Sequence, residues 1–295
     1  MNIRIKFQKY GNMRFIGHLD MMRYFQKCMR RAKIDIAYSA GYSPHQIMSF
    51  AAPLGVGITS DGEYLDIEVN TLMDSTKAIK DLNEVMVDGV RILEYKQLPD
   101  NAKNAMSLVA GADYTIYFKE GYENPFSFSE LADSLNSFYN DQAEIIITKK
   151  TKKSEKMIDL KGLIYQLNAI DLSQDNTLKY STLNLNTLTH HKLNADTLGI
   201  NTLNHSILNH DIRVFSEETP AFFLKVCAGS TDNVKPELVL EAFFTFCNKA
   251  YDPLALQIHR NEVYGLDANE KLIPLGEFGH DTPTRNDSMK TGEDN

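Results

Sequence analysis

Residues 15–50 read FIGHLDMMRYFQKCMRRAKIDIAYSAGYSPHQIMSF, and this stretch decides the fold of the first third of the chain. Apolar residues recur at helical spacing from about residue 18 to residue 32, which predicts an amphipathic helix. The predicted apolar face consists of Leu19, Met22, Phe25, Met29 and Ala32. The opposite, basic face consists of Arg23, Lys27, Arg30 and Arg31.

Strand patterns flank this helix. Residues 2–10 alternate apolar and polar side chains, which predicts a half-buried strand with Arg4, Lys6 and Gln8 on its outer side. Residues 34–38 predict a second strand. Residues 54–59 and 63–69 predict a hairpin around Ser60-Asp61-Gly62, a typical turn sequence.

A second helix from about residue 75 and a strand over 90–95 complete the order β-α-β-β-α-β of a ferredoxin-like unit. The pattern then recurs: a strand at 112–119, a helix opened by the capping box Ser127 to Glu130, a basic hairpin around 149–156, and a helix from Pro236. The predicted fold class is therefore α+β, with two tandem ferredoxin-like units.

The predicted domains are residues 1–97, a linker at 98–111, a second domain at 112–275 and a disordered tail at 276–295. An insertion at about 171–211 interrupts the second domain. Its leucines recur every five residues from Leu178 to Leu208, and five of the seven follow a threonine. A low-complexity surface loop is the favoured interpretation, and a short ordered coil of repeats is the alternative.

The chain has 295 residues and a net charge of −8, but the charge is unevenly distributed. Nine lysines and arginines against two acids give residues 1–50 a charge of +7, so the remainder carries −15. A basic segment on an acidic protein points to an anionic partner, with a solvated helix face as the alternative. Three scattered cysteines and the lack of a long apolar segment predict a cytoplasmic protein without a membrane span.

His18, Asp20 and His45 are the candidates for acid–base chemistry. Histidine titrates near neutral pH, and a carboxylate in the same cleft tunes it. The return of the chain from the helix through residues 34–38 is expected to bring the three side chains within about 10 Å of one another. A role in local hydrogen bonding is the alternative, and the spacing matches no metal-binding motif.

A nucleic-acid interface is the second kind of site that the sequence indicates. Arginine and lysine interleaved with tyrosine is a combination that proteins use to bind single-stranded nucleic acid. The candidate binding residues are Arg14, Arg23, Lys27, Arg30, Arg31 and Tyr42.

These motifs resemble those of the radical-SAM-linked proteins, a family with a domain of unknown function (number 2344). The resemblance rests on Phe15, Gly17, His18, Leu19, Asp20 and Arg23, on Gly41 to His45, on Ser49-Phe50, and on Pro53-Leu54 with Gly57. The segment AGSTDNVKPELVLEA near the C-terminus is also similar to the family's closing motif.

The resemblance implies a radical SAM enzyme as partner, and this partner is expected to use S-adenosylmethionine and an iron–sulfur cluster. No cofactor is expected in this chain, which lacks a closely spaced cysteine triplet. The implied function is that of an accessory protein that presents or recognises an anionic, RNA-related substrate. A stand-alone acid–base enzyme and a purely structural docking module remain the alternatives.

Overall fold

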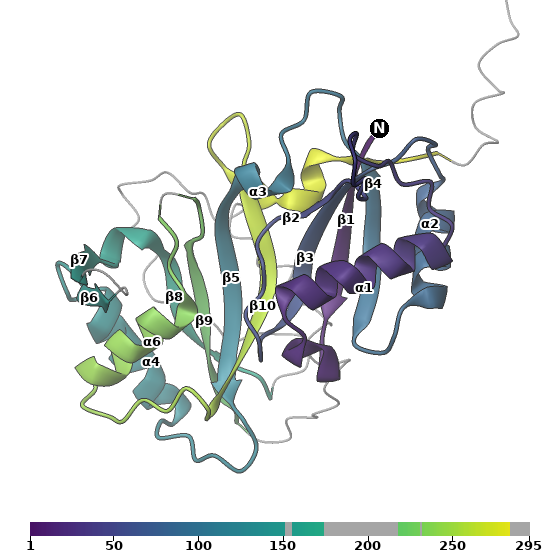
Figure 1. The fold of residues 1–295 in the computed structure, drawn as a ribbon. Coiled ribbons are helices and arrows are strands. Elements are labelled where there is room, and N and C mark those ends of the chain that lie inside the picture. Colours follow the sequence, from purple (N-terminus) through teal and green to yellow (C-terminus); the bar gives the residue numbers. More distant parts are fainter. Residues whose placement is uncertain (151–154, 174–217, 231, 284–295) are drawn as a thin grey trace, which may run out of the picture. The chain divides into compact units, whose positions relative to one another are not determined.

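The computed structural model describes residues 1–150, 155–173, 218–230 and 232–283 (Figure 1). The chain divides into two compact units. The first unit holds residues 1–109, 263–266 and the chain from residue 273 on, and the second holds residues 110–262 and 267–272. Both combine helices with antiparallel strands, so the protein belongs to the α+β class.

The first unit follows the predicted order of strands and helices. Its elements are β1 (Asn2–Lys9), the 3-10 turn η1 (Gly11–Phe15), α1 (His18–Arg31), β2 (Met48–Phe50), β3 (Thr59–Glu68), α2 (Ser75–Val85), β4 (Val90–Gln97) and α3 (Ala105–Leu108). β1 pairs antiparallel with β3 and β4, and β2 pairs antiparallel with β3. The strands therefore lie in the order β4-β1-β3-β2.

The core of this unit lies between its sheet and the helices α1 and α2. Figure 1 shows α1 lying across the strands. Ile3, Ile5 and Phe7 of β1 point into this core, as the alternation predicts, and the ring of Phe25 on α1 lies 4.8 Å from that of Phe7. Leu82 of α2 joins the same cluster. The helices are thus held by apolar contacts with one face of the sheet.

Helix α1 buries most of the predicted apolar face: Phe25, Met29 and Ala32 lie in the core, and Met22 packs against it. Its buried residues are Met21, Phe25, Cys28 and Met29. Leu19, predicted to lie on the apolar face, is 68 % exposed, so this part of the prediction is wrong. A stripe through Met21 and Cys28 has the same helical spacing, and cysteine packs as a small apolar residue. Because Met21 is buried, Leu19 faces solvent.

The other face of the sheet is also covered, which contradicts the exposed positions predicted for Arg4 and Gln8. Arg4 is 1 % exposed and donates hydrogen bonds to both carboxylate oxygens of Asp66, at 2.8 and 2.9 Å. It also donates to the carbonyl oxygen of Leu275 at 3.0 Å. Gln8 is buried and donates to the Asp61 carboxylate at 2.9 Å. The covering residue Leu275 is distant in sequence, so no local pattern predicts the burial of Arg4.

The C-terminal segment of the described chain completes the first unit. It forms a 3-10 turn, η6 (Leu275–Phe278), and a short strand, β12 (His280–Asp281), that pairs with β4. Thr282 is buried, and its backbone N–H donates a hydrogen bond to Ser75 Oγ at 2.8 Å. Residues 276–283 are therefore ordered, in contrast to the predicted disordered tail. Residues 284–295 lie outside the described part of the chain.

The predicted hairpin around Ser60-Asp61-Gly62 is wrong, because all three residues lie inside β3. Ser60 Oγ accepts a hydrogen bond from the Gly62 N–H at 3.1 Å. The register between β1 and β3 shifts at this level, between Phe7 and Lys9. Residues that are typical of a turn therefore lie at an irregularity in a continuous strand. Their polar side chains form hydrogen bonds within the protein.

The predicted strand at residues 34–38 is also absent as a regular strand among the described residues. The segment makes two isolated bridges, Ile36 with Val69 and Tyr38 with Gln46. The regular partner of β3 is β2, ten residues further along than the end of that prediction.

The remaining longer elements lie mostly in the second unit, although the ends of β10 and β11 belong to the first. They are β5 (Val109–Phe118), α4 (Phe128–Tyr139), β6 (Ile146–Lys150), β7 (Glu155–Asp159), the turn η2 (Lys161–Leu163), β8 (Ile164–Asp171), β9 (Pro220–Cys227), α6 (Pro236–Phe246), β10 (Leu256–Leu266) and β11 (Leu272–Pro274). β9 pairs antiparallel with β5 and β8, and the strand order is β10-β5-β9-β8. β6 and β7 form a separate two-stranded sheet.

Local signals in this unit are confirmed. Ser127 and Glu130 form the predicted capping box of α4, and Pro236 lies in the first turn of α6. The predicted linker at 98–111 contains buried Leu98 and Ala105 together with α3 and the start of β5. Most of the predicted insertion at 171–211 lies outside the described residues, which end at residue 173 and resume at 218.

Candidate binding surface on helix α1

Helix α1 begins at Gly17-His18-Leu19-Asp20 without a side-chain cap. Gly17 occupies the N-cap position in an extended conformation and has no side chain to accept a hydrogen bond from the first turn. Asp20 does not replace it, because its carboxylate pairs with Arg23 at 3.0 Å. The two side chains are 66 % and 72 % exposed, and an exposed pair of this kind contributes at most about 1 kcal/mol. Asp20 therefore contributes to the helix start only through its charge in the first turn and this weak ion pair, and it does not cap the helix.

His18 is held by packing at the start of α1. Its ring centroid lies 5.2 Å from that of Phe50 on β2, with the planes nearly perpendicular. Phe50 in turn packs against Phe25, with ring centroids 5.7 Å apart. The imidazole is thus half-buried and positioned by the aromatic core beneath the helix.

His45 lies in an exposed loop and is oriented by Ser39. Ser39 Oγ is 2.8 Å from His45 Nδ1 and accepts a hydrogen bond from the His45 backbone N–H at 3.1 Å. The Ser39 N–H donates to the His45 carbonyl oxygen at 2.8 Å, which closes the loop. Tyr42 stands at the tip and is fully exposed. The loop therefore presents an imidazole and a phenol to solvent on a closed turn.

The base of this loop is tied to the middle of α1. Gln46 Nε2 donates to the Gln26 carbonyl oxygen at 3.3 Å. Eight residues of helix separate Gln26 from His18, which corresponds to about 12 Å along the axis. Among the described residues, no hydrogen bond or ion pair joins any two of His18, Asp20 and His45. Their convergence on one pocket stays a prediction.

The basic face of α1 is exposed as the sequence predicts. Arg23, Lys27, Arg30 and Arg31 are all exposed, and their spacing places them on one side of the helix. Arg31 donates to the Val85 carbonyl oxygen at 3.0 Å, which fixes its guanidinium beside the end of α2. Within the described part of the chain, Lys27 and Arg30 have no ion-pair partner.

Exposed apolar side chains adjoin this basic face, and sequence reasoning missed them. Phe15, at the end of η1, is 57 % exposed, and Leu19, in the first turn of α1, is 68 % exposed. The Arg14 guanidinium lies 5.0 Å from the centre of the Phe15 ring, a cation–π contact. The sequence contains an indication of this patch, because residues 15–29 include more apolar side chains than one face of α1 can bury.

These residues together define the α1 surface: Arg14, Phe15, Leu19, Arg23, Lys27, Arg30 and Arg31. Not every nearby tyrosine belongs to it. Tyr24 accepts a hydrogen bond from the Val87 N–H at 2.8 Å, and burial raises the pKa of its phenol to about 12. Tyr24 is therefore part of the packing between α1 and the end of α2.

The arrangement is suited to binding an anion with an apolar or aromatic part. Cations in a row on a rigid helix attract a chain of negative charges, and exposed aromatic rings add stacking. In the described ranges, no group of three His, Cys, Asp or Glu side chains is placed to hold a metal ion. Nor does any described helix have the length and apolar character needed to cross a bilayer.

A family comparison covers this surface. Residues 2–195 match the model of a family described as an uncharacterized protein conserved in bacteria (DUF2344). The chain belongs to this family. The match includes all of β1 to β4, with the start of α1 and the loop that carries His45. A search of curated proteins finds no significant match.

Proposed function

We propose that the protein is an accessory binding protein whose α1 surface recognises an anionic substrate and presents it to a radical SAM enzyme. The observation that carries the proposal is the row of exposed cations on α1, in which Lys27 and Arg30 lack a described ion-pair partner. The whole chain has a charge of −8, so this local positive field steers an anion to one place on an otherwise acidic protein.

An RNA-related substrate fits the chemistry of this surface. Phosphates along a single strand can contact the cations of α1, while Phe15 offers an exposed ring for a base to stack on. Tyr42 offers a second exposed ring on the loop that carries His45. The resemblance to radical-SAM-linked proteins supplies the partner, which would carry the S-adenosylmethionine and the iron–sulfur cluster.

A protein-docking role is the second candidate, and the exposure of Phe15 and Leu19 favours it. Exposed apolar residues rimmed by arginines are common at protein interfaces. In this case α1 would contact the partner enzyme directly. The acid–base role of His18, Asp20 and His45 has weaker support, because the described contacts give each of them a different partner.

We also propose that both units are ferredoxin-like, as the sequence predicts. Within the first unit the order along the chain is β-α-β-β-α-β, with the sheet order β4-β1-β3-β2. Leaving out the hairpin β6–β7, the second unit has the same order along the chain and the corresponding sheet order β10-β5-β9-β8. Two units with one topology support a tandem duplication.

The test is binding of a fluorescent single-stranded oligouridylate at increasing salt. If four phosphates are neutralised, log Kd should change with log salt with a slope of about 3. Replacing Arg23, Lys27, Arg30 and Arg31 together with glutamine should flatten that slope.

A matched control removes four cations of the same unit that lie outside the α1 surface: Lys77, Lys80, Arg91 and Lys103. This control should retain most of the slope. Absence of binding at low salt, or an equal loss in both variants, would reject substrate recognition on α1. Co-purification of a radical SAM protein that survives Lys27→Gln but not Leu19→Asp would favour docking instead.

A further inference from the structure

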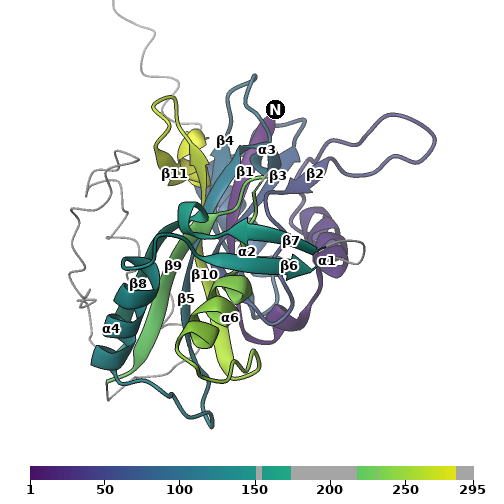
Figure 2. The same ribbon diagram turned by 90° about the vertical axis from the view of Figure 1, so that its left-hand side faces the viewer.

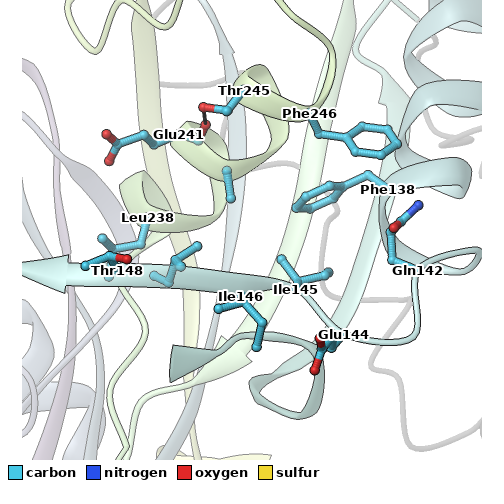
Figure 3. Close-up of a pocket in the computed structure, with 12 residues that line it drawn as sticks. Phe138, Gln142, Glu144, Ile145, Ile146, Thr148, Leu238, Glu241, Thr245 and Phe246 are labelled. Atoms are coloured by element: carbon cyan, nitrogen blue, oxygen red, sulfur yellow. Dashed lines mark hydrogen bonds between the residues drawn. The ribbon is translucent and has the colours of Figure 1, made fainter. Parts of the chain in front are cut away.

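A groove in the second unit, away from the α1 surface, has the features of a peptide-binding site. It runs between β6 and α6 and has a volume of about 420 Å³ (Figure 3). One wall is β6 with the two residues before it, because five consecutive residues, 144–148, line the groove. Side chains alternate along a strand, so consecutive residues line a groove only where it runs along the strand's edge.

The opposite wall is a stripe on α6. Leu238, Ala242 and Thr245 line the groove and recur at helical spacing. Phe246 closes the stripe, with its ring centroid 5.5 Å from that of Phe138 and its side chain 44 % exposed. Figure 3 shows these aromatic rings at one end of the groove and Leu238 with Thr148 at the other.

The edge of β6 that faces this groove has unused backbone groups. β6 and β7 form a two-stranded sheet, so each has one strand partner only within the described residues. Figures 2 and 3 both show β6 between its hairpin partner and α6. The outer edge of β6 therefore points at the helix.

The hydrogen-bond pattern identifies which residues offer these groups. The Leu160 N–H donates to the Ile145 carbonyl oxygen at 2.8 Å, so residues 145 and 160 form a hydrogen-bonded pair. In an antiparallel ladder such pairs alternate with non-bonded ones, and the register runs unbroken from Ile146 opposite Asp159. Ile146 and Thr148 are thus in non-bonded pairs, and their N–H and C=O groups point into the groove.

We propose that this groove binds an extended segment of a partner protein, which adds to β6 as a third strand. Strand addition supplies main-chain hydrogen bonds, and pockets for alternate side chains supply specificity. The pocket at Phe138 and Phe246 takes an apolar side chain of the segment. The exposed Ile146 and the apolar stripe on α6 contact the added strand along the rest of its length.

Charge fixes the preferred composition of the segment. The exposed Lys156 of β7 lies opposite residue 149, next to Thr148 at one end of the groove. Glu144 lines the groove at the other end. An acidic residue on the segment near Lys156, followed by an apolar residue at the aromatic end, complements this pattern.

The test uses an array of nine-residue peptides. Each peptide has two acidic residues at one end, and its other residues are mainly valine and threonine. Only the central residue varies between peptides. Peptides with a central leucine, isoleucine, methionine or phenylalanine should bind, and aspartate or glycine at that position should lower the affinity at least tenfold.

Two pairs of variants locate the site. Thr148→Pro removes an N–H that points into the groove and should weaken the best peptide at least tenfold. Met157→Pro removes an N–H from the opposite edge of the same hairpin and should change the affinity less than twofold. Phe246→Ala should weaken binding about tenfold, whereas Leu254→Ala, at a 69 % exposed site outside the groove, should not.

Circular dichroism and melting temperature establish that each variant is folded. If Thr148→Pro does not fold, the pair Phe246→Ala and Leu254→Ala still decides the question. No binding by any peptide, or equal losses in Thr148→Pro and Met157→Pro, would overturn the proposal. A concentration-dependent dimer that Thr148→Pro abolishes would show that a second copy is the occupant and would also overturn it.

Discussion

Helices α1 and α4 are the first helices of the two units, and they differ in how their N-termini are capped. At α4, Ser127 Oγ accepts a hydrogen bond from the Glu130 N–H at 3.3 Å, and the Glu130 carboxylate accepts one from the Ser127 N–H at 2.8 Å. At α1, Gly17 provides no such cap, and Asp20 pairs with Arg23. The polar side chains at the start of α4 cap their helix, and those at the start of α1 do not.

The difference teaches how to weigh a polar motif. A serine and a glutamate three residues apart at a helix start have a local role, so they carry little information about function. Gly17-His18-Leu19-Asp20 forms no such cap: His18 packs against Phe50, and Leu19 is exposed although it is apolar. A motif whose residues do little for their own helix points to contacts outside the chain.

The largest expected effect tests whether packing in the core stabilises α1, which has no side-chain cap. Phe25→Ala removes a fully buried ring that packs against Phe7 and Phe50, and it should lower the free energy of unfolding by about 3–5 kcal/mol. Urea denaturation followed by circular dichroism measures it. A loss below about 1 kcal/mol would mean that α1 is held in another way and would undermine the comparison.

Salt provides the next largest effect. Raising the salt concentration from 50 to 200 mM should weaken oligouridylate binding about 50-fold, the result of a slope near 3. Peptide binding in the β6–α6 groove depends mainly on main-chain and apolar contacts, so the same change should weaken it less than about threefold. Anisotropy titrations of the two probes on one protein sample make the comparison, and equal salt dependence would contradict the assignment of two chemistries.

Removing the polar side chain at each helix start sharpens the comparison directly. Ser127→Ala deletes the cap of α4 and should cost about 1 kcal/mol of unfolding free energy. Asp20→Ala deletes only an exposed ion pair and should cost less than about 0.5 kcal/mol. If thermal denaturation showed the reverse order, Asp20 would be a structural residue, and its link to substrate recognition would be lost.

The smallest effect concerns alkaline pH and the inner faces of both helices. Burial raises the pKa of Tyr24 to about 12, and burial also raises the pKa of Tyr139, whose hydroxyl donates to the Ile164 carbonyl oxygen at 2.7 Å. A folded-state pKa above the unfolded value near 10 gives a stabilisation that is complete below pH 10 and is lost as the pH rises toward 12. Partial exposure limits this contribution of Tyr24 to less than about 1 kcal/mol.

Tyr24→Phe should therefore flatten the decline of stability between pH 10 and pH 12. Tyr42→Phe, at a fully exposed loop position, serves as the matched control and should leave the decline unchanged. Chemical denaturation at closely spaced pH values provides the measurement. An identical decline in both variants would mean that Tyr24 ionises as easily in the folded protein as in the unfolded one.

Local signals in the sequence predicted a large part of the secondary structure. The helical spacing from residue 18, the capping box at Ser127 and the proline at 236 each act within a few residues, and each is confirmed. The basic face of α1 was also predicted correctly, because charged side chains on a periodic helix rarely lie inside. Whether His18, Asp20 and His45 share a site stays a prediction.

The remaining errors have a common physical cause, which is contact between residues distant in sequence. Arg4 is buried because Asp66 and Leu275 satisfy its guanidinium, and neither is near it in the chain. The β6–α6 groove combines residues about 90 positions apart, so no motif in the sequence indicated it. Leu19 was misplaced for a different reason, because two apolar stripes on α1 have the same period.

The return of residues 275–282 to the first unit has a consequence for synthesis of the protein. During translation, β1, β4 and α2 leave the ribosome early, but the Leu275 carbonyl group that accepts from Arg4 and the Thr282 N–H that donates to Ser75 follow only after residues 110–262 of the second unit. The N-terminal half therefore cannot reach its final state as it emerges, although domains commonly fold in that order. Nascent chains stalled before residue 275 should present an incomplete first unit to chaperones and proteases.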